Sequence, residues 1–411
     1  MSEIIIDSTL CTACGACENI CPKSCIRRNK KISGFIMEKG EGCIECGLCS
    51  KVCPIQVPPE LLYPQKAYAA WNTDNRIRRT SASGGIAAAI YQYALQKKYK
   101  FVGAYLDKSF ECHLSIGNTE EDIKKFQNSK YTYSFPDDIY KKVAELANQG
   151  QHIFFIGLPC QVAAVKKYFQ ALHLKFNNIL LIDIICHGTP NPDYLKSHIN
   201  AIAKGEKIDK IYFRDANFDT SKYAYTMYKH TSNKPFYKKY VGEDDLYQIG
   251  YHRALIYQDS CYSCQFAQIN RVGDLAIGDF HVWDEESCDI DTENVSTILV
   301  NTERGMNLLE ILLSNNALQV IERSIEETIK GEKQLRHPSV AGPERKLFLK
   351  EYEKLQDYEL AADIAFRGIV RRRKLKIDEL ELRIKKTIKM FVPRKLWLLV
   401  KFKIKNKDYK D

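Results

Sequence analysis

Residues 11–22 read CTACGACENICP, and residues 43–54 read CIECGLCSKVCP. Both runs share one pattern, in which two residues separate each of the first three cysteines, and a fourth cysteine follows after three residues and precedes a proline. Three thiols at that spacing wrap the chain around one metal centre, whereas the fourth lies too far along the chain to reach the same centre. The fourth thiol of each run is therefore expected to cross to the centre that the other run holds.

This crossed pattern is the spacing of bacterial ferredoxins that hold two 4Fe-4S clusters. The sequence predicts the clusters on two sets of thiols: Cys11, Cys14, Cys17 and Cys53, and Cys43, Cys46, Cys49 and Cys21. Zinc is the alternative, since Cys-x2-Cys pairs also bind zinc, but two complete runs that reach across to each other are hard to explain that way. Cys25 stands outside the pattern and is interpreted as a core or spectator residue.

The composition is that of an ordinary soluble protein. The chain has 411 residues, of which 45% are hydrophobic and 27% are charged, and no apolar run approaches the roughly 20 residues of a membrane-spanning helix. The N-terminus lacks a basic segment ahead of an apolar one, so we expect no secretory signal and a cytoplasmic location. In a reducing cytosol the fifteen cysteines are expected to be metal ligands, catalytic thiols or core residues rather than disulfides.

The composition and the apolar pattern of the sequence change at two places. Residues 1–60 are short turns rich in Cys, Gly and Pro, and Val57-Pro58-Pro59 closes them as a linker. Residues 64–345 alternate helical patterns with apolar, strand-like runs, which predicts an α/β (α+β) central domain with a mixed sheet. The strand-like runs are Phe101–Tyr105, Ile153–Gly157, Ile179–Ile185, Ile208–Phe213 and Ser296–Val300. Residues 346–411 are interpreted as a basic helical tail.

The positive charge is concentrated in that tail. Residues 366–407 carry a local charge of +13 against a total of +10, so the other 369 residues carry −3. This distribution argues against a general nucleic-acid surface. An apolar stripe with flanking lysines is also compatible with peripheral membrane contact at the inner face, or it packs on the body of the protein. The stripe consists of Ile377, Leu380, Ile384, Ile388 and Phe391, followed by Trp397.

Four further cysteines form a second candidate set. Cys160 and Cys186 follow predicted strands, and open α/β sheets place their sites at such strand ends. Cys261 and Cys264 form a further Cys-x2-Cys pair. Spacing alone leaves two possibilities, a four-thiolate set or two structural cysteines beside a zinc-binding pair. Cys112 and Cys288 lack partners and are interpreted as structural.

Six short motifs occur in an order that resembles the family of coenzyme F-420 hydrogenase/dehydrogenase beta subunits. They are Arg79-Thr80-Ser81-Ala82-Ser83-Gly84-Gly85, Ser129-Lys130-Tyr131, Gly157-Leu158-Pro159-Cys160-Gln161, Cys186-His187-Gly188, Phe213-Arg214-Asp215 and Ile277-Gly278-Asp279-Phe280. The resemblance implies a flavoprotein that passes electrons between 4Fe-4S clusters and a flavin, and it favours a third cluster on Cys160, Cys186, Cys261 and Cys264. Similar bacterial members with a fused ferredoxin segment often belong to polysaccharide loci, which suggests a small-molecule or saccharide substrate.

The flavin is expected where small residues precede a helix, because free amides and the helix dipole attract a phosphate there. Ser81, Ser83, Gly84 and Gly85 form this loop, and Arg78 and Arg79 beside it are candidates to pair a pyrophosphate. An ordinary capped helix is the commoner explanation of such a loop, and the family resemblance shifts the balance toward a flavin. Lys130 and Asp279 are further candidates, with a solvated lysine and a capping aspartate as the alternatives. His187 is a donor to the third cluster, a proton shuttle or a core histidine that the backbone satisfies.

These parts predict an iron–sulfur flavin-dependent oxidoreductase. A flavin converts between single electrons and a hydride, so a redox protein such as ferredoxin, or another subunit, would exchange electrons with the N-terminal clusters. The alternatives are an electron-transfer subunit without its own substrate and a cluster-stabilised binding module. The sequence does not assign a catalytic residue, the direction of electron flow, the choice between FAD and FMN, or coenzyme F-420 as the substrate.

Overall fold

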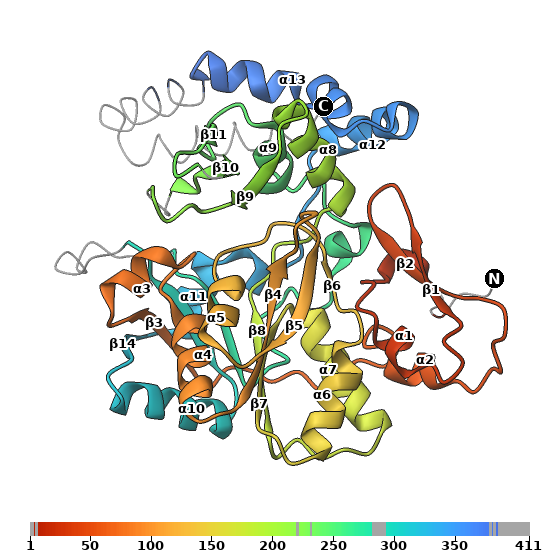
Figure 1. The fold of residues 1–411 in the computed structure, drawn as a ribbon, viewed down its shortest axis with the longest axis vertical. Coiled ribbons are helices and arrows are strands. Elements are labelled where there is room, and N and C mark those ends of the chain that lie inside the picture. The colour runs from red at the N-terminus through yellow and green to blue at the C-terminus, as the bar shows by residue number, and fades with distance from the viewer. Residues whose placement is uncertain are drawn as a thin grey trace, which may run out of the picture.

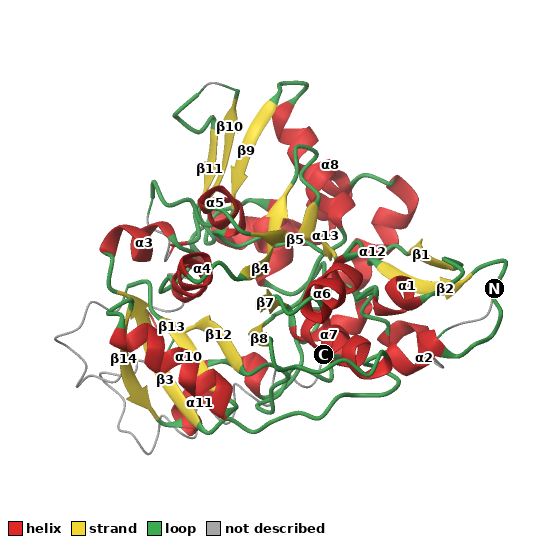
Figure 2. Cartoon of the chain, turned by 60° about the horizontal axis from the view of Figure 1, so that its bottom comes forward, coloured by secondary structure: helices red, strands yellow, loops and turns green. Residues whose placement is uncertain are grey.

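A computed structural model describes residues 4, 7–218, 222–230, 232–281, 293–377, 380 and 384. Its centre is a mixed sheet of nine strands with helices on both faces (Figures 1 and 2). Strands β12, β8, β7 and β4 are parallel, as are β5 and β6, and the remaining pairs are antiparallel. The order across the sheet is β14 (Leu318–Arg323), β3 (Lys66–Asn72), β13 (Ser296–Val300), β12 (Leu275–Asp279), β8 (Ile179–Ile184), β7 (Ile153–Gly157), β4 (Lys100–Leu106), β5 (Cys112–Gly117) and β6 (Ser134–Phe135). The predicted α/β class with a mixed sheet is confirmed.

Alternation of side chains along β7 explains how the sheet divides its core. Ile153 and Phe155 face one apolar cluster, whereas Phe154 and Ile156 face the other, because successive strand residues point to opposite faces. The first cluster includes residues of α6 (Ile139–Asn148) and α7 (Pro159–Ala171). The second includes residues of α4 (Ile86–Gln96), α5 (Glu120–Phe126) and α10 (Glu303–Ser314). All five strand-like runs are strands, although 208–213 forms β9 (Ile208–Tyr212) outside the central sheet.

The N-terminal segment packs against the helices on one face of the sheet (Figure 1). It consists of η1 (Ser8–Leu10), α1 (Ala16–Ile20), the hairpin β1 (Ile26–Lys30) and β2 (Phe35–Lys39), and α2 (Leu48–Val52). The hydroxyl of Tyr133 donates to the carbonyl oxygen of Ala13 at 2.6 Å, and that of Tyr140 donates to the carbonyl of Cys14 at 2.7 Å. The cysteine-rich segment and the sheet therefore share one core.

A smaller layer lies beyond one end of the large sheet. Its antiparallel sheet contains β9, β10 (Tyr225–Lys229) and β11 (Tyr237–Lys239), and its helices are α8 (Pro192–Ala203), α9 (Leu246–His252), α12 (Glu344–Leu355) and α13 (Tyr358–Lys374). Phe348 and Phe366 are fully buried in one cluster with Tyr194 and Tyr225. Residues 346–355 and 358–374 are helical as expected, and they also complete this core. Short elements close the remaining loops: α3 (Asn75–Thr80), η3 (Asp259–Ser263), α11 (Ile325–Gly331) and η5 (Lys333–Leu335).

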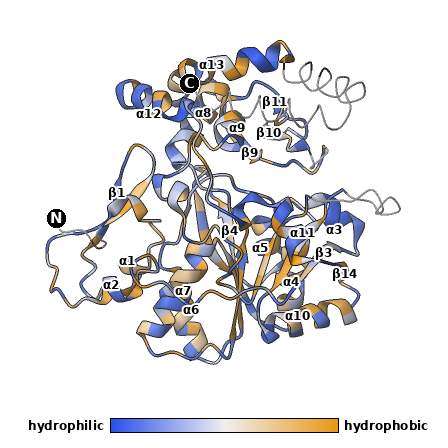
Figure 3. Cartoon of the chain, turned by 180° about the vertical axis from the view of Figure 1, so that it is seen from behind, coloured by the Kyte–Doolittle hydropathy of each residue, from blue (hydrophilic) through white to orange (hydrophobic). Residues whose placement is uncertain are grey.

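The division into segments 1–60, 64–345 and 346–411 stays a prediction, as does the role of the basic tail. Leu380 and Ile384 of the predicted stripe are 58% and 49% exposed, while Ile388, Phe391 and Trp397 lie outside the described residues. Figure 3 shows α12 as largely hydrophilic on its visible side. None of the helices among the described residues is long and apolar enough to cross a membrane.

A buried histidine joins three elements of the smaller layer. His198 of α8 is 1% exposed and contacts the Asp245 carboxylate at 3.0 Å and the Glu359 carboxylate at 2.8 Å. Burial opposes protonation, but the two carboxylates raise the pKa of His198 to about 10. The imidazolium therefore stabilises the contact of α8 with α9 and α13.

We expect this contact to weaken in alkaline solution. The folded pKa of His198 lies above its ordinary value of 6.5, so its contribution is fully present below pH 6.5 and is lost as the pH rises toward 10. The free energy of unfolding should fall by at most about 1.4 kcal/mol per pH unit over this window. Thermal unfolding at pH 6.5 and 9.5 checks this: the wild type should lose more stability than His198→Gln. Equal losses in the two proteins would show that His198 is not the group responsible.

Candidate functional site

A cavity of about 960 Å³ opens at the carboxyl ends of β7, β8 and β12. Gly157 comes from the first of these strands, His187 follows the second, and Asp279 ends the third. This is the edge at which open α/β sheets bind ligands. The volume lies near the top of the range of about 300–1,000 Å³ for small-molecule sites.

One wall of the cavity is the small-residue loop ahead of α4. Ser81, Ser83 and Gly85 line the cavity, and Gly84 lies behind them against β3 and β13. The amide of Gly84 donates to the Ser296 hydroxyl at 2.8 Å. Gly85 adopts a left-handed φ of 82° and leaves the N-terminus of α4 without a side-chain cap. Free amides at a helix N-terminus suit an anion such as a phosphate.

Gly84→Ala tests the close packing of the loop backbone against β3 and β13. A Cβ at this position would lie 2.4 Å from the carbonyl oxygen of Ala70 and 2.8 Å from the amide nitrogen of Ser296. Because both neighbours are backbone, the loop must shift, and overpacking of this kind costs roughly 1–3 kcal/mol. Thermal unfolding should show the loss, while Gly242→Ala, where nothing lies within 4 Å, should be close to wild type. Equal melting temperatures for the two variants would contradict this packing.

A buried ion pair occupies the next part of the wall. The Arg214 guanidinium binds both carboxylate oxygens of Asp279, at 3.0 and 2.5 Å, and donates to the hydroxyl of Tyr131 at 2.7 Å and to the carbonyl oxygen of Ala82. The Tyr223 ring covers it, with 3.9 Å between the guanidinium carbon and the ring centroid. Burial opposes ionisation of Asp279, but Arg214 lowers its pKa far below the usual range. The pair ties β12 to the small-residue loop.

Arg214 is thus a functional candidate that local sequence patterns do not identify. Its motif, Phe213-Arg214-Asp215, contributed to the family resemblance, but no local pattern showed that the side chain enters the cavity beside Asp279. The arginines beside the small-residue loop lie elsewhere. Arg78 donates to backbone carbonyls of residues 293 and 294 and covers the Trp71 ring, and Arg79 is 59% exposed beside Glu293. Neither lines the cavity, so the expected pairing with a pyrophosphate has no support in this geometry.

Lys130 lines the cavity, but its amine is already engaged. Its Nζ donates to four backbone carbonyls at the end of α5, at distances of 2.6–3.1 Å. Burial lowers the pKa of Lys130 to about 8. The side chain therefore holds the turn that follows α5, and a direct contact of its amine with a flavin would require it to leave these carbonyls.

Histidine side chains also line the cavity. His187 and His281 approach the Glu332 carboxylate at 3.6 and 3.7 Å. The Nε2 atom of His252 is buried and has no hydrogen-bond partner among the described residues. Burial lowers the pKa of His252 to about 3, so this imidazole is neutral at physiological pH.

Four cysteines that are distant in sequence line one smaller cavity. They are Cys160, Cys186, Cys261 and Cys264. Burial, reinforced by the neighbouring thiols, raises the pKa of Cys261 to about 11 and raises those of Cys160 and Cys186 further. The Thr12 side chain lines the same cavity and interacts with the Cys14 thiol. Four thiols that line one cavity fit the four-thiolate ligand set of an iron–sulfur cluster.

This four-thiol cavity adjoins the large cavity and the first N-terminal cysteine set. His187 and Gly188 line it and also line the large cavity. On the other side, the thiol of Cys14 lies close enough to raise the pKa of Cys160, after the larger effect of burial. Arg271 fixes the loop after Cys264, because its buried guanidinium donates to Asp183 at the end of β8.

The first predicted N-terminal set is compact. Burial is the main cause that raises the pKa values of Cys11, Cys14 and Cys17, and the thiols of this set, including Cys53, raise them further. In the second set, Cys49 is buried and Cys46 is exposed. Cys25, interpreted from the sequence as a core or spectator residue, is buried, but its sulfur lies 3.4 Å from that of Cys21.

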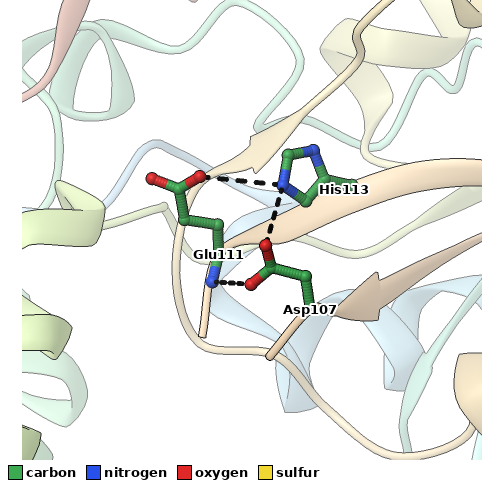
Figure 4. Close-up of side chains that lie close together, drawn as sticks. All are labelled: Asp107, Glu111 and His113. Carbon is green, nitrogen blue, oxygen red and sulfur yellow. Dashed lines mark hydrogen bonds and ion pairs between the residues drawn. The ribbon is translucent and has the colours of Figure 1, made fainter. Parts of the chain in front are cut away.

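A separate cluster of Asp107, Glu111 and His113 lies at the turn between β4 and β5 (Figure 4). Its carboxylates already bind protein groups: Asp107 accepts from the amides of Ser109 and Glu111, and Glu111 accepts from the Lys196 amine. The cluster is therefore satisfied by its own neighbours.

Comparisons with known proteins agree with this architecture. Residues 4–27 match the model of a 4Fe-4S binding domain, while residues 67–136 and 150–325 match the N-terminal and C-terminal parts of "Coenzyme F420 hydrogenase/dehydrogenase, beta subunit". Among curated proteins, one of the subunits of "F(420)H(2) dehydrogenase" from Methanosarcina mazei is 27% identical over 210 residues, which cover 47% of this chain and 58% of that protein. "Coenzyme F420-dependent sulfite reductase" of Methanocaldococcus jannaschii is 24% identical over 321 residues, covering 73% and 46%.

The chain therefore spans about half the length of these two relatives. A chain of the xenon-derivatised F420-reducing [NiFe] hydrogenase complex from Methanosarcina barkeri is similar over 73% of this chain and 92% of its own length, with 19% identity and a TM-score of 0.45. The fold and the cysteine sets define an iron–sulfur protein with a large cavity at the edge of a mixed sheet. Its two beta-subunit domains, with a 4Fe-4S binding domain ahead of them, show that the chain belongs to the family of coenzyme F420 hydrogenase/dehydrogenase beta subunits.

Proposed function

We propose that the chain is an iron–sulfur flavin oxidoreductase, which exchanges electrons with a redox protein and a hydride with an organic substrate. One observation carries the proposal, which is that the four-thiol cavity shares a wall with the large cavity. On its other side, Cys160 of this cavity lies near Cys14 of the first N-terminal set. With the second N-terminal set, the three thiol sets would form a series from the surface to the cavity. Exposed Cys46 and Ile44, which is 57% exposed, lie at the outer end of the series.

The residues that would hold each group follow from the site. The twelve cysteines of the three sets would bind the clusters, and the loop Ser81–Gly85 with the N-terminus of α4 would bind the phosphate of FAD or FMN. When bound, the clusters supply one-electron transfer and the flavin exchanges electrons for a hydride. The chain itself would orient the flavin through the Arg214–Asp279 pair at the wall of the large cavity.

The substrate class rests on the relatives and the resemblance. Both curated relatives carry coenzyme F420 in their names, so we propose a deazaflavin, or another small organic hydride carrier, as the molecule that meets the flavin in the cavity. Cluster potentials vary widely with their environment, so the proposal covers both directions of electron flow. A saccharide substrate, a polysaccharide-locus setting and peripheral membrane contact stay predictions.

A second candidate is an electron-transfer subunit without its own substrate. One relative is named a subunit, and the chain spans only 58% and 46% of the two relatives. The two candidates differ in one measurement. A self-contained enzyme oxidises its reduced flavin when substrate is added to the isolated chain, whereas a subunit does so only after its partner is supplied.

Reductive titration of the anaerobically purified chain tests the proposed function. Three clusters accept one electron each and a flavin accepts two, so the chain should consume about five electron equivalents of dithionite. Flavin and cluster absorbance should bleach in the same titration. Uptake of about two equivalents without flavin bleaching would contradict the proposal, because the central domain would then hold neither group.

A further inference from the structure

We propose that Cys25 is an alternative ligand of the second N-terminal cluster and can take the place of Cys21. The inference rests on the proposed function, since it requires a cluster on the second cysteine set. The sulfur atoms of Cys21 and Cys25 lie 3.4 Å apart. The backbone amide of Cys25 also donates to the Cys21 sulfur at 3.4 Å. Either of these two thiols could therefore supply the fourth ligand of the cluster.

The surroundings of Cys25 direct its thiol toward this set. Cys25 is 4% exposed, so its thiol faces the protein and not solvent. Its side chain interacts with Cys43 as well as Cys21, and both are predicted ligands of the same cluster. The amide of Gly40 donates to the carbonyl oxygen of Cys25 at 2.7 Å, which holds this backbone against the end of the β1–β2 hairpin. An exchange of ligands therefore needs side-chain movement and little change in the backbone.

The other cysteine run differs at this position. Cys21 and Cys53 end α1 and α2 with nearly the same backbone angles, φ −69° and ψ 113° against φ −70° and ψ 112°. Four residues later the first run has Cys25, whereas the second has Val57. The amide of Val57 donates to the carbonyl oxygen of Cys53 at 2.9 Å. The two runs thus provide a matched comparison, with a thiol four residues after Cys21 and an apolar side chain four residues after Cys53.

The exchange is balanced without an oxidant or reductant. The bond between iron and the Cys21 sulfur breaks, and a bond between iron and the Cys25 sulfur forms. The proton of the Cys25 thiol passes to the released Cys21 thiolate, so neither charge nor oxidation state changes. The second set lies near the surface, where Cys46 is exposed, and a fifth thiol would let this cluster keep four cysteine ligands when the Cys21 sulfur leaves the iron.

Four full-length proteins purified without oxygen test this inference: wild type, Cys21→Ser, Cys53→Ser, and Cys21→Ser with Cys25→Ser. Iron and acid-labile sulfide per chain, with electron paramagnetic resonance of the reduced proteins, are the measurements. Cys21→Ser should retain the wild-type iron content and three cluster spins. Cys53→Ser and the double variant should each lose one cluster, about four irons.

The outcomes separate this inference from the function on which it rests. If the wild type holds no second N-terminal cluster, the proposed function fails. If the wild type holds that cluster and Cys21→Ser loses it as fully as Cys53→Ser loses its own, the inference about Cys25 fails alone. The inference about Cys25 also fails if Cys21→Ser is less stably folded than Cys53→Ser. A spare ligand should make the loss of Cys21 less damaging than the loss of Cys53.

Discussion

Arg214→Met is expected to empty the flavin site and to lower the free energy of unfolding by roughly 3–5 kcal/mol. The substitution removes the guanidinium that binds both oxygens of the Asp279 carboxylate, and it leaves a buried charge without this compensation. The carbonyl oxygen of Ala82 also loses its donor, so the small-residue loop is released from β12. Flavin content of the purified protein and its denaturant unfolding are the two measurements.

Two variants make this expectation specific. Arg79→Met changes an exposed arginine close to the same loop, and surface substitutions of this kind stay within about 0.5 kcal/mol. Arg214→Met combined with Asp279→Asn removes both charges and should recover part of the lost stability, because the buried carboxylate is gone. If Arg214→Met is as mild as Arg79→Met, the ion pair does not hold the site.

The second large effect concerns the four-thiol cavity. Cys160→Ser should remove one cluster, about four irons, and leave the two N-terminal clusters in place. Because this set lies between Cys14 and the large cavity, the flavin should then no longer be reduced through the N-terminal segment. Stopped-flow mixing with a reduced ferredoxin measures both steps, since the N-terminal clusters should still bleach while the flavin stays oxidised.

Cys112→Ser is the matched control for iron content. Cys112 is buried and lines the large cavity, but it does not line the four-thiol cavity. It should keep the wild-type amount of iron. If Cys160→Ser also keeps it, the four cysteines are structural, and electrons must pass from the N-terminal segment to the cavity without them.

Local sequence patterns predicted most of the central domain. Apolar runs such as Ile153–Gly157 are strands because both of their faces are buried, and a run of that kind leaves few alternatives. The cysteine spacing identified the N-terminal segment as a cluster-binding segment, because most ligands of each cluster lie close together in the sequence. Strand ends and spacing left a four-thiolate set and structural cysteines both open, and the family resemblance favoured the set. The approach of Cys160 to Cys261 depends on the order of β7, β8 and β12 in the sheet, which local patterns do not encode.

The expectations without structural support concern long side chains. Arg79 lies in the last turn of α3 and ends at the surface, a direction that sequence adjacency to the loop does not encode. Lys130 lies beside the cavity, but the carbonyls at the end of α5 bind its amine. Arg214 was passed over for the converse reason: it follows β9 in the smaller layer and reaches across to Asp279. Such contacts arise from tertiary packing and leave no periodic signal in the sequence.

The metal, sulfide and flavin content of one anaerobically purified sample tests the central claim most directly. Three cubane clusters predict about twelve irons and twelve sulfides per chain, and the cavity predicts one flavin. Zinc should be present only in traces. Stoichiometric zinc with little iron would contradict the assignment of the cysteine sets, and with it the proposal that this chain transfers electrons.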